Sequence, residues 1–107
     1  MKPITILGEE ITIKFNMAVE IAYEEIVGEP FTIEALKSQK NSAALYMSAI
    51  LASKPDTKIT MERLIHEADG PTISSLSQAI INAMSEWMKL PAVIQEEPVE
   101  QPAEEKN

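Results

Sequence analysis

Catalytic or metal-binding chemistry would have to come from one histidine and scattered carboxylates, because the 107-residue chain contains no cysteine. His66 follows Glu62 by about one helical turn, so this pair could offer two ligands to a metal ion. A protein metal site needs three or four ligands, and the chain has no second histidine. We therefore expect no metal site, and we interpret Glu62 and His66 as an exposed helical pair.

Adjacent carboxylates occur at positions 9–10, 24–25 and 96–97. Neighbouring side chains diverge on a helix, and none of these pairs lies in an apolar pocket that would raise a carboxyl pKa for acid catalysis. The three glycines are isolated at turn positions, so no phosphate-binding loop or nucleophile elbow is present. We expect no catalytic residue, no cofactor and no enzyme activity.

The net charge of −8 argues against a nucleic-acid partner, because phosphate binding needs clustered basic residues and Arg63 is the only arginine. No apolar run approaches the roughly 20 residues that cross a bilayer, so no membrane association is expected. The initial Met-Lys-Pro leads into a strand pattern instead of a signal-peptide apolar region. We expect a soluble intracellular protein.

The first residues alternate in the way that is typical of a β-hairpin. Positions 8–9, Gly-Glu, are expected to form a two-residue type II′ turn in which the glycine takes positive φ. This turn pairs Ile6 with Ile11 and Ile4 with Ile13. The four isoleucines then share one face, which needs a cover because a lone hairpin is marginal in water.

Helical periodicity and capping residues account for the region after the hairpin. The segment at 43–53 is apolar all round, so we expect it to be buried at the centre of the fold. In the other helices, Ile26, Ile65 and Trp87 are expected to point toward the core. The expected segments are a helix from Asn16 to Gly28, a short turn after Thr32, and helices at 43–53, 60–68 and 72–90.

Two pairs of apolar side chains point away from the expected core. Met17 and Ile21 fall among the glutamates of the first helix, while Ile81 and Met88 border the apolar arc of the last one. Apolar side chains on a polar face mark sites of association. We expect self-association into a homo-oligomer, or binding of a protein partner, through these surfaces.

The composition changes near the C-terminus. Residues 95–107 hold five glutamates, one lysine and two prolines, which is half of the net negative charge. Such a stretch cannot bury enough apolar surface to offset its ordering entropy. We expect a single folded α+β domain over residues 1–92 and a disordered acidic tail over residues 93–107.

Three segments carry a family resemblance: residues 4–15 (ITILGEEITIKF), 17–28 (MAVEIAYEEIVG) and 80–88 (IINAMSEWM). Together they resemble the tail assembly chaperones of long-tailed bacteriophages and prophages, over residues 4–90. Those proteins begin with a hairpin that has a glycine turn, continue with a glutamate-rich helix that ends at glycine, and finish as a small helical body. The residue pattern and the resemblance together predict an α+β fold, an N-terminal β-hairpin followed by four to five helices.

The resemblance also implies a non-enzymatic role in the bacterial host cytoplasm. The protein would coat the long tape measure protein and recruit tail tube protein during tail assembly. A tape measure is an extended, largely helical chain with apolar seams, which many copies of a small acidic protein could mask. The alternative is a small acidic adaptor or inhibitor, such as an anti-repressor-like protein, that binds a basic protein surface.

Overall fold

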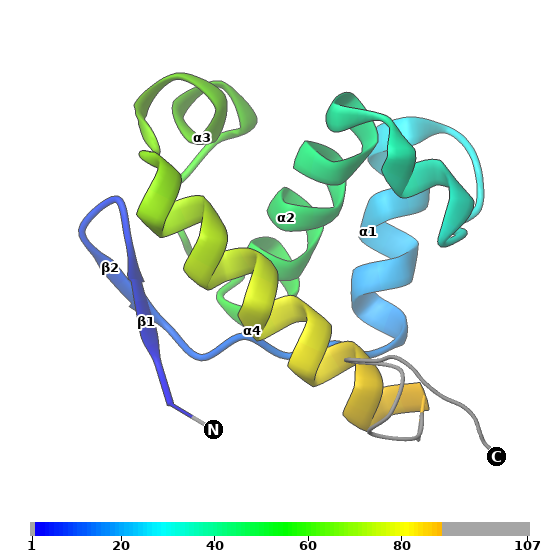
Figure 1. The fold of residues 1–107 in the computed structure, drawn as a ribbon, viewed down its shortest axis with the longest axis horizontal. Coiled ribbons are helices and arrows are strands. Elements are labelled where there is room, and N and C mark those ends of the chain that lie inside the picture. The colour runs from blue at the N-terminus through cyan, green and yellow to red at the C-terminus, as the bar shows by residue number, and fades with distance from the viewer. Residues whose placement is uncertain (1, 89–107) are drawn as a thin grey trace, which may run out of the picture.

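The computed structural model describes residues 2–88, in which an N-terminal hairpin is followed only by helices (Figure 1). The strands β1 (Ile4–Ile6) and β2 (Glu9–Ile11) pair antiparallel. Within these residues the helices are α1 (Met17–Val27), the 3₁₀ helix η1 (Glu34–Lys37), α2 (Gln39–Ser53), α3 (Met61–Glu67) and α4 (Gly70–Met88). The α+β fold is confirmed. The expected domain end at residue 92 and tail over residues 93–107 lie outside the described residues.

The hairpin turn is formed by Leu7 and Gly8, one residue earlier than expected from the sequence. Their φ angles are 48° and 86°, and positive φ at both central residues is what a type I′ turn requires. Bulky residues rarely take positive φ, which is why the sequence favoured Gly8 as the first turn residue. Leu7 is half-buried and packs against the core, and this contact helps to hold it in the strained conformation.

The strand register is different from the expected one. Ile4 pairs with Ile11, and Ile6 pairs with Glu9, so the expected pairs were wrong. The shift moves each partner by two residues, however, and side chains alternate with period two, so every side chain keeps its face. Ile6, Ile11 and Ile13 are buried, and Ile4 packs against them from the rim. Glu9, which was expected in the turn, lies at the turn end of β2 on the same face as the isoleucines.

Helix α2 lies at the centre of the core, as its apolar circumference predicted. It contacts α1, η1, α3 and α4, and Figure 1 shows it between α1 and α4. Full burial of an aliphatic side chain is typically worth about 1.5–3 kcal/mol, so this contact region is the main source of stability. Besides the hairpin isoleucines, its buried members include Val19, Tyr23, Leu45, Met47, Ile50, Leu64, Leu76 and Ile80.

Polar side chains set the ends of α1 and the start of α3. The Asn16 side chain accepts a hydrogen bond from the Ala18 N–H at 3.0 Å, and α1 ends at Gly28, whose φ is 88°. Thr60 Oγ1 accepts from the Arg63 N–H at 3.1 Å at the start of α3. These caps satisfy backbone groups that the first and last turns leave unpaired. The caps lie at the ends expected for these two helices, at Asn16, Gly28 and Thr60.

Helices α2 and α4 begin earlier than the sequence indicated, because other residues cap them. Ser38 Oγ accepts from the Asn41 N–H at 3.3 Å, which places Asn41 inside the first turn of α2. The Asp69 carboxylate accepts from the Thr72 N–H at 2.8 Å, and Gly70 is already helical. Asp69, which follows the expected end of the preceding helix at residue 68, acts as the starting cap of the next helix.

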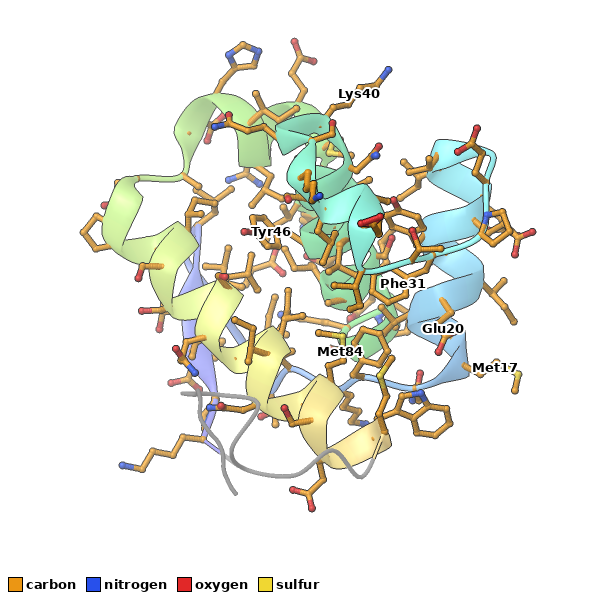
Figure 2. All side chains as sticks on the ribbon, turned by 45° about the vertical axis from the view of Figure 1, so that its right-hand side comes forward. Met17, Glu20, Phe31, Lys40, Tyr46 and Met84 are labelled. Atoms are coloured by element: carbon orange, nitrogen blue, oxygen red, sulfur yellow. The ribbon has the colours of Figure 1, made fainter. Side chains whose placement is uncertain are left out.

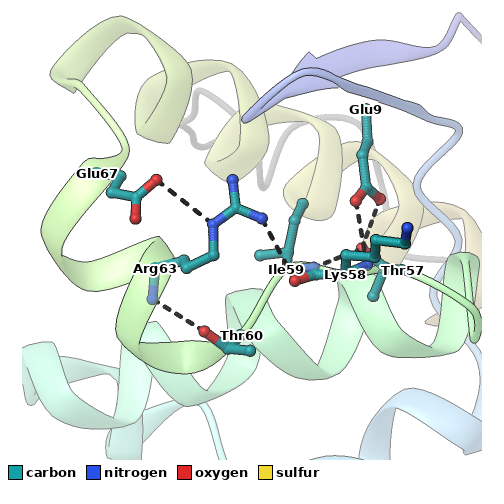
Figure 3. A network of polar contacts seen from close by, with 7 residues as sticks. All are labelled: Glu9, Thr57, Lys58, Ile59, Thr60, Arg63 and Glu67. Carbon is teal, nitrogen blue, oxygen red and sulfur yellow. Dashed lines mark hydrogen bonds and ion pairs between the residues drawn. The ribbon is translucent and has the colours of Figure 1, made fainter.

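A carboxylate clasp ties the hairpin to the segment that joins α2 and α3 (Figure 3). Glu9 Oε1 accepts from the Thr57 hydroxyl at 2.6 Å, and Glu9 Oε2 accepts from the Lys58 N–H at 3.1 Å. The Lys54 ammonium lies 3.4 Å from Oε1. The Thr57 hydroxyl, with help from Lys58 and Lys54, lowers the pKa of Glu9 although partial burial opposes the shift.

Arg63 extends this network on the α3 side. Its Nη1 donates to the Lys58 carbonyl at 3.3 Å, and its Nε donates to Glu67 Oε1 at 3.4 Å (Figure 3). Lys58 therefore donates a hydrogen bond to Glu9 through its backbone N–H and accepts one from Arg63 at its carbonyl oxygen. Backbone groups in a connecting segment need such partners when no ladder supplies them.

The clasp predicts a pH dependence of stability. Because the native pKa of Glu9 lies below its ordinary value of 4.5, its contribution is complete above pH 4.5 and is lost as pH falls through the native pKa. Glu9→Gln should lower the urea midpoint at neutral pH and flatten the decline of stability on the acid side. Urea unfolding over a pH series tests this, with Glu10→Gln on the opposite hairpin face as control. Equal profiles for both variants would contradict it.

The buried hydroxyl of Tyr23 gives a second prediction about the core. The ring packs edge-on against Phe31 with centroids 5.4 Å apart, and the described residues give the hydroxyl no hydrogen-bond partner. Burial, and secondarily the Glu29 carboxylate, raises the pKa of this phenol. An unpaired buried hydroxyl is costly, so Tyr23→Phe should raise the free energy of unfolding by up to about 1 kcal/mol. A loss of stability in urea unfolding would show that the hydroxyl has a partner.

Candidate protein-binding surfaces

A largely apolar groove of about 650 Å³ lies between α2, α3 and the start of α4. Tyr46 and Lys40, both labelled in Figure 2, line this groove from α2. Among the described residues that line the groove, Lys40 alone carries a charge at neutral pH. The remaining wall is mainly apolar, and it includes Tyr46, Met61, Leu64, Ile65, Ala68 and Ile73.

Sequence reasoning missed this groove because it assigned Ile65 to the buried stripe of α3. Leu64 is buried, but Ile65 is 56% exposed. Helix α3 has only seven residues, α2 is the element that it mainly contacts, and Leu64 is its buried residue. Neighbouring side chains point about 100° apart, so a two-turn helix that buries Leu64 leaves Ile65 on the open side. The indicative signal was the shortness of the segment between Thr60 and Asp69.

Helix α1 carries the second candidate surface, which we call the α1 face and define as Met17, Ile21, Glu24 and Glu25. Met17 is 63% exposed and Ile21 is 51% exposed, on the side where the helical wheel placed them. Figure 2 shows Met17 directed away from the body of the protein. Both glutamates are exposed and flank the apolar pair. The role of these residues in binding stays a prediction.

Trp87 lies next to this face. Its Nε1 donates to Glu20 Oε2 at 3.3 Å, which brings the last turn of α4 beside the first turns of α1. The indole also borders a shallow hollow of about 490 Å³ together with Lys14 and Phe15. Trp87 was expected to lie inside, yet it is 43% exposed, because the extended segment before α1 covers it only in part. Ile26, likewise expected inside, is exposed on α1.

The other predicted pair, Ile81 and Met88, is exposed on α4. The two residues are seven positions apart, which is close to two helical turns, so they share one strip of the helix. Met88 follows Trp87, and this strip is therefore turned by about 100° from the side chain that meets α1. The observed link between α1 and α4 runs through Glu20 and Trp87.

Three further observations bear on chemistry. His66 and Glu62 are both exposed on α3. Within residues 2–88, no three His, Cys, Asp or Glu side chains come together as a metal site would require. No helix in the same part of the chain is long and apolar enough to cross a membrane.

The acidic side chains near the end of α1 lower the stability of this helix. Glu24 and Glu25 lie in or near its last turn, where the helix dipole is negative, and that turn contains no basic residue. Acidic side chains are favourable at the start of a helix and unfavourable at its end. A local arrangement that lowers stability without a compensating contact is typical of a functional surface.

Comparison of the chain with protein families, curated proteins and solved structures gave no match. The described residues present two candidate binding surfaces. One is a groove with an apolar wall, and the other is a convex helical face with an acidic border. Both are suited to contacts with proteins.

The dipole argument gives a stability test. Glu24→Lys should raise the free energy of unfolding by a few tenths of a kcal/mol, because Lys suits the helix end and lies four residues after Glu20. The gain should shrink in high salt. Glu62→Lys is the matched control: it changes charge equally, but in the first turn of α3, and should lower stability. Urea unfolding of both variants measures the signs, and a fall with Glu24→Lys would refute the argument.

Proposed function

We propose that this protein is a tail assembly chaperone of a long-tailed bacteriophage or prophage. It acts in the bacterial cytoplasm, where it binds the tape measure protein and the tail tube protein and catalyses no reaction. The resemblance of residues 4–90 supports this, and so does the order of elements, a hairpin with a glycine in its turn and then helices only.

The observation that carries the proposal is the apolar groove between α2, α3 and α4. Its volume of about 650 Å³ accommodates several side chains of a partner, and its wall contains Met61 and Tyr46, residue types common at protein interfaces. A groove of this kind suits the apolar stripe of a partner helix. A tape measure presents such stripes along its length, so many copies of the protein could mask it.

Acidity supports the same proposal. A net charge of −8 keeps a complex of many copies soluble while apolar surfaces are engaged.

Co-expression tests the proposal. The full chain is produced with the product of the very long reading frame next to its gene, and the complex is isolated through a tag and sized by light scattering. We expect a soluble assembly with many copies of the chaperone, whereas the long protein alone should precipitate. Failure of the chain to keep its neighbour soluble, or a genome without such a neighbour, would overturn the assignment.

The groove can be tested separately. Ile65→Asp places a charge in the groove and should abolish or strongly weaken tape measure binding. Ile33→Asp is the matched control, because Ile33 is 59% exposed and does not line the groove. Both variants should fold, as checked by circular dichroism. Equal binding by the two variants would remove the groove from the proposal.

The alternative function, a small acidic adaptor or inhibitor that binds a basic protein surface, is favoured by the α1 face. That face carries glutamates and no basic residue. The two functions differ in which variant eliminates partner binding. A groove variant should abolish binding of a tape measure, whereas charge reversal on α1 should abolish the action of an acidic inhibitor.

A further inference from the structure

The α1 face combines exposed apolar side chains with uncompensated charge. Met17 and Ile21 are one helical turn apart and more than half exposed, so they form a short apolar strip. The two glutamates stand on either side of this strip, at positions 24 and 25. A strip with a charged border is the arrangement that helices use when they pair with another helix.

The charge of this face has one sign only. Helix α1 contains three glutamates and no lysine or arginine. The ion pairs found within residues 2–88 lie elsewhere, at Glu34, Glu9 and Glu67. Glu24 and Glu25 therefore have no cationic partner in the described part of the chain, and they lie at the helix end that disfavours them. A cationic partner would relieve both conditions.

Trp87 gives this face an aromatic anchor. The hydrogen bond from its Nε1 to Glu20 fixes the indole beside α1 while leaving it 43% exposed. Exposed tryptophan side chains carry much of the energy at protein interfaces, and they attract Lys and Arg through the ring face. Trp87 and the two glutamates therefore both favour a partner that carries Lys or Arg.

We infer that the α1 face, together with Trp87, binds an amphipathic helix of a partner protein whose apolar stripe is bordered by Lys and Arg. The apolar stripe covers Met17 and Ile21, and the basic residues meet Glu24, Glu25 and the indole. This inference depends on the face alone and not on the tail chaperone assignment. The proposed site is distinct from the groove between α2, α3 and α4.

The probes are synthetic helical peptides of about three heptads that contain no tryptophan. One has leucine at the a and d positions with lysine at e and g, one has glutamate at e and g, and one is a scrambled form of the lysine peptide. Trp87 is the only tryptophan of the chain, so its emission reports binding at this surface. We expect a saturable blue shift with the lysine peptide alone, weaker at high salt.

Variants locate the site. Glu24→Lys with Glu25→Lys, and separately Met17→Ser with Ile21→Ser, should each weaken the lysine peptide by about tenfold or more. The matched control is Glu10→Lys with Glu62→Lys, which changes net charge equally on β2 and α3 and should leave the dissociation constant within about a factor of two. Ile65→Asp in the groove should likewise have little effect.

Several outcomes would overturn the inference. No emission change up to about 1 mM lysine peptide would do so. Equal binding of the scrambled peptide would indicate charge attraction without a helical site, and equal weakening by the control pair would indicate a net-charge effect. A dimer in light scattering that Met17→Ser with Ile21→Ser dissociates would show that a second copy occupies the face. If Ile65→Asp releases a tape measure while the lysine peptide gives no emission change, the proposed function stands and this inference falls.

Discussion

The rest of the structure depends on covering one face of a hairpin that cannot stand alone. Two strands of three residues each have little stability in water, yet they present a row of isoleucines that must leave the solvent. Helix α4 contacts β1, and α2 completes the same buried core. The Glu9 carboxylate then holds the turn end of the hairpin against the chain between α2 and α3, so that the cover has a defined position.

Covering that face uses the central helices and leaves the outer ones only partly buried. Helix α2 is enclosed on most sides, whereas α3 reaches the core mainly through Leu64 and α1 mainly through Val19 and Tyr23. The remaining apolar side chains of these outer helices, such as Ile65 and Met17, face solvent. In a chain of this size the core is too small to bury them, so they stay exposed.

The two surfaces differ in shape and charge, and this difference suits a protein with two partners. In Figure 1, α1 lies on one side of α2 and α3 on the other, while the last turn of α4 reaches the first turns of α1. The α1 face and the α3 wall of the groove therefore lie on opposite sides of α2. The charged residue that lines the groove is Lys40, whereas the charged groups of the α1 face are carboxylates. Under the proposed function, a chaperone that brings tube protein to a tape measure needs two such sites.

The sequence by itself determined the features that depend on neighbours along the chain. The isoleucine face of the hairpin follows from period two, the ends of α1 follow from Asn16 and Gly28, and the exposure of Met17 and Ile21 follows from period 3.6. The buried face of the hairpin was predicted correctly although the expected register was wrong, because a shift of two residues keeps each side chain on its face. Local backbone geometry is encoded in local residues, so it can be derived from them.

Only the tertiary structure decided which apolar residues stay exposed and which polar groups meet. Glu9 finds Thr57, which is 48 residues away in the chain, and no local pattern predicts that contact. Ile65 and Trp87 have the periodicity of core residues, yet both are exposed, because burial depends on how much surface neighbouring elements cover. Periodicity gives the direction of a side chain relative to its helix, but the extent of its burial depends on where other helices end and how they pack.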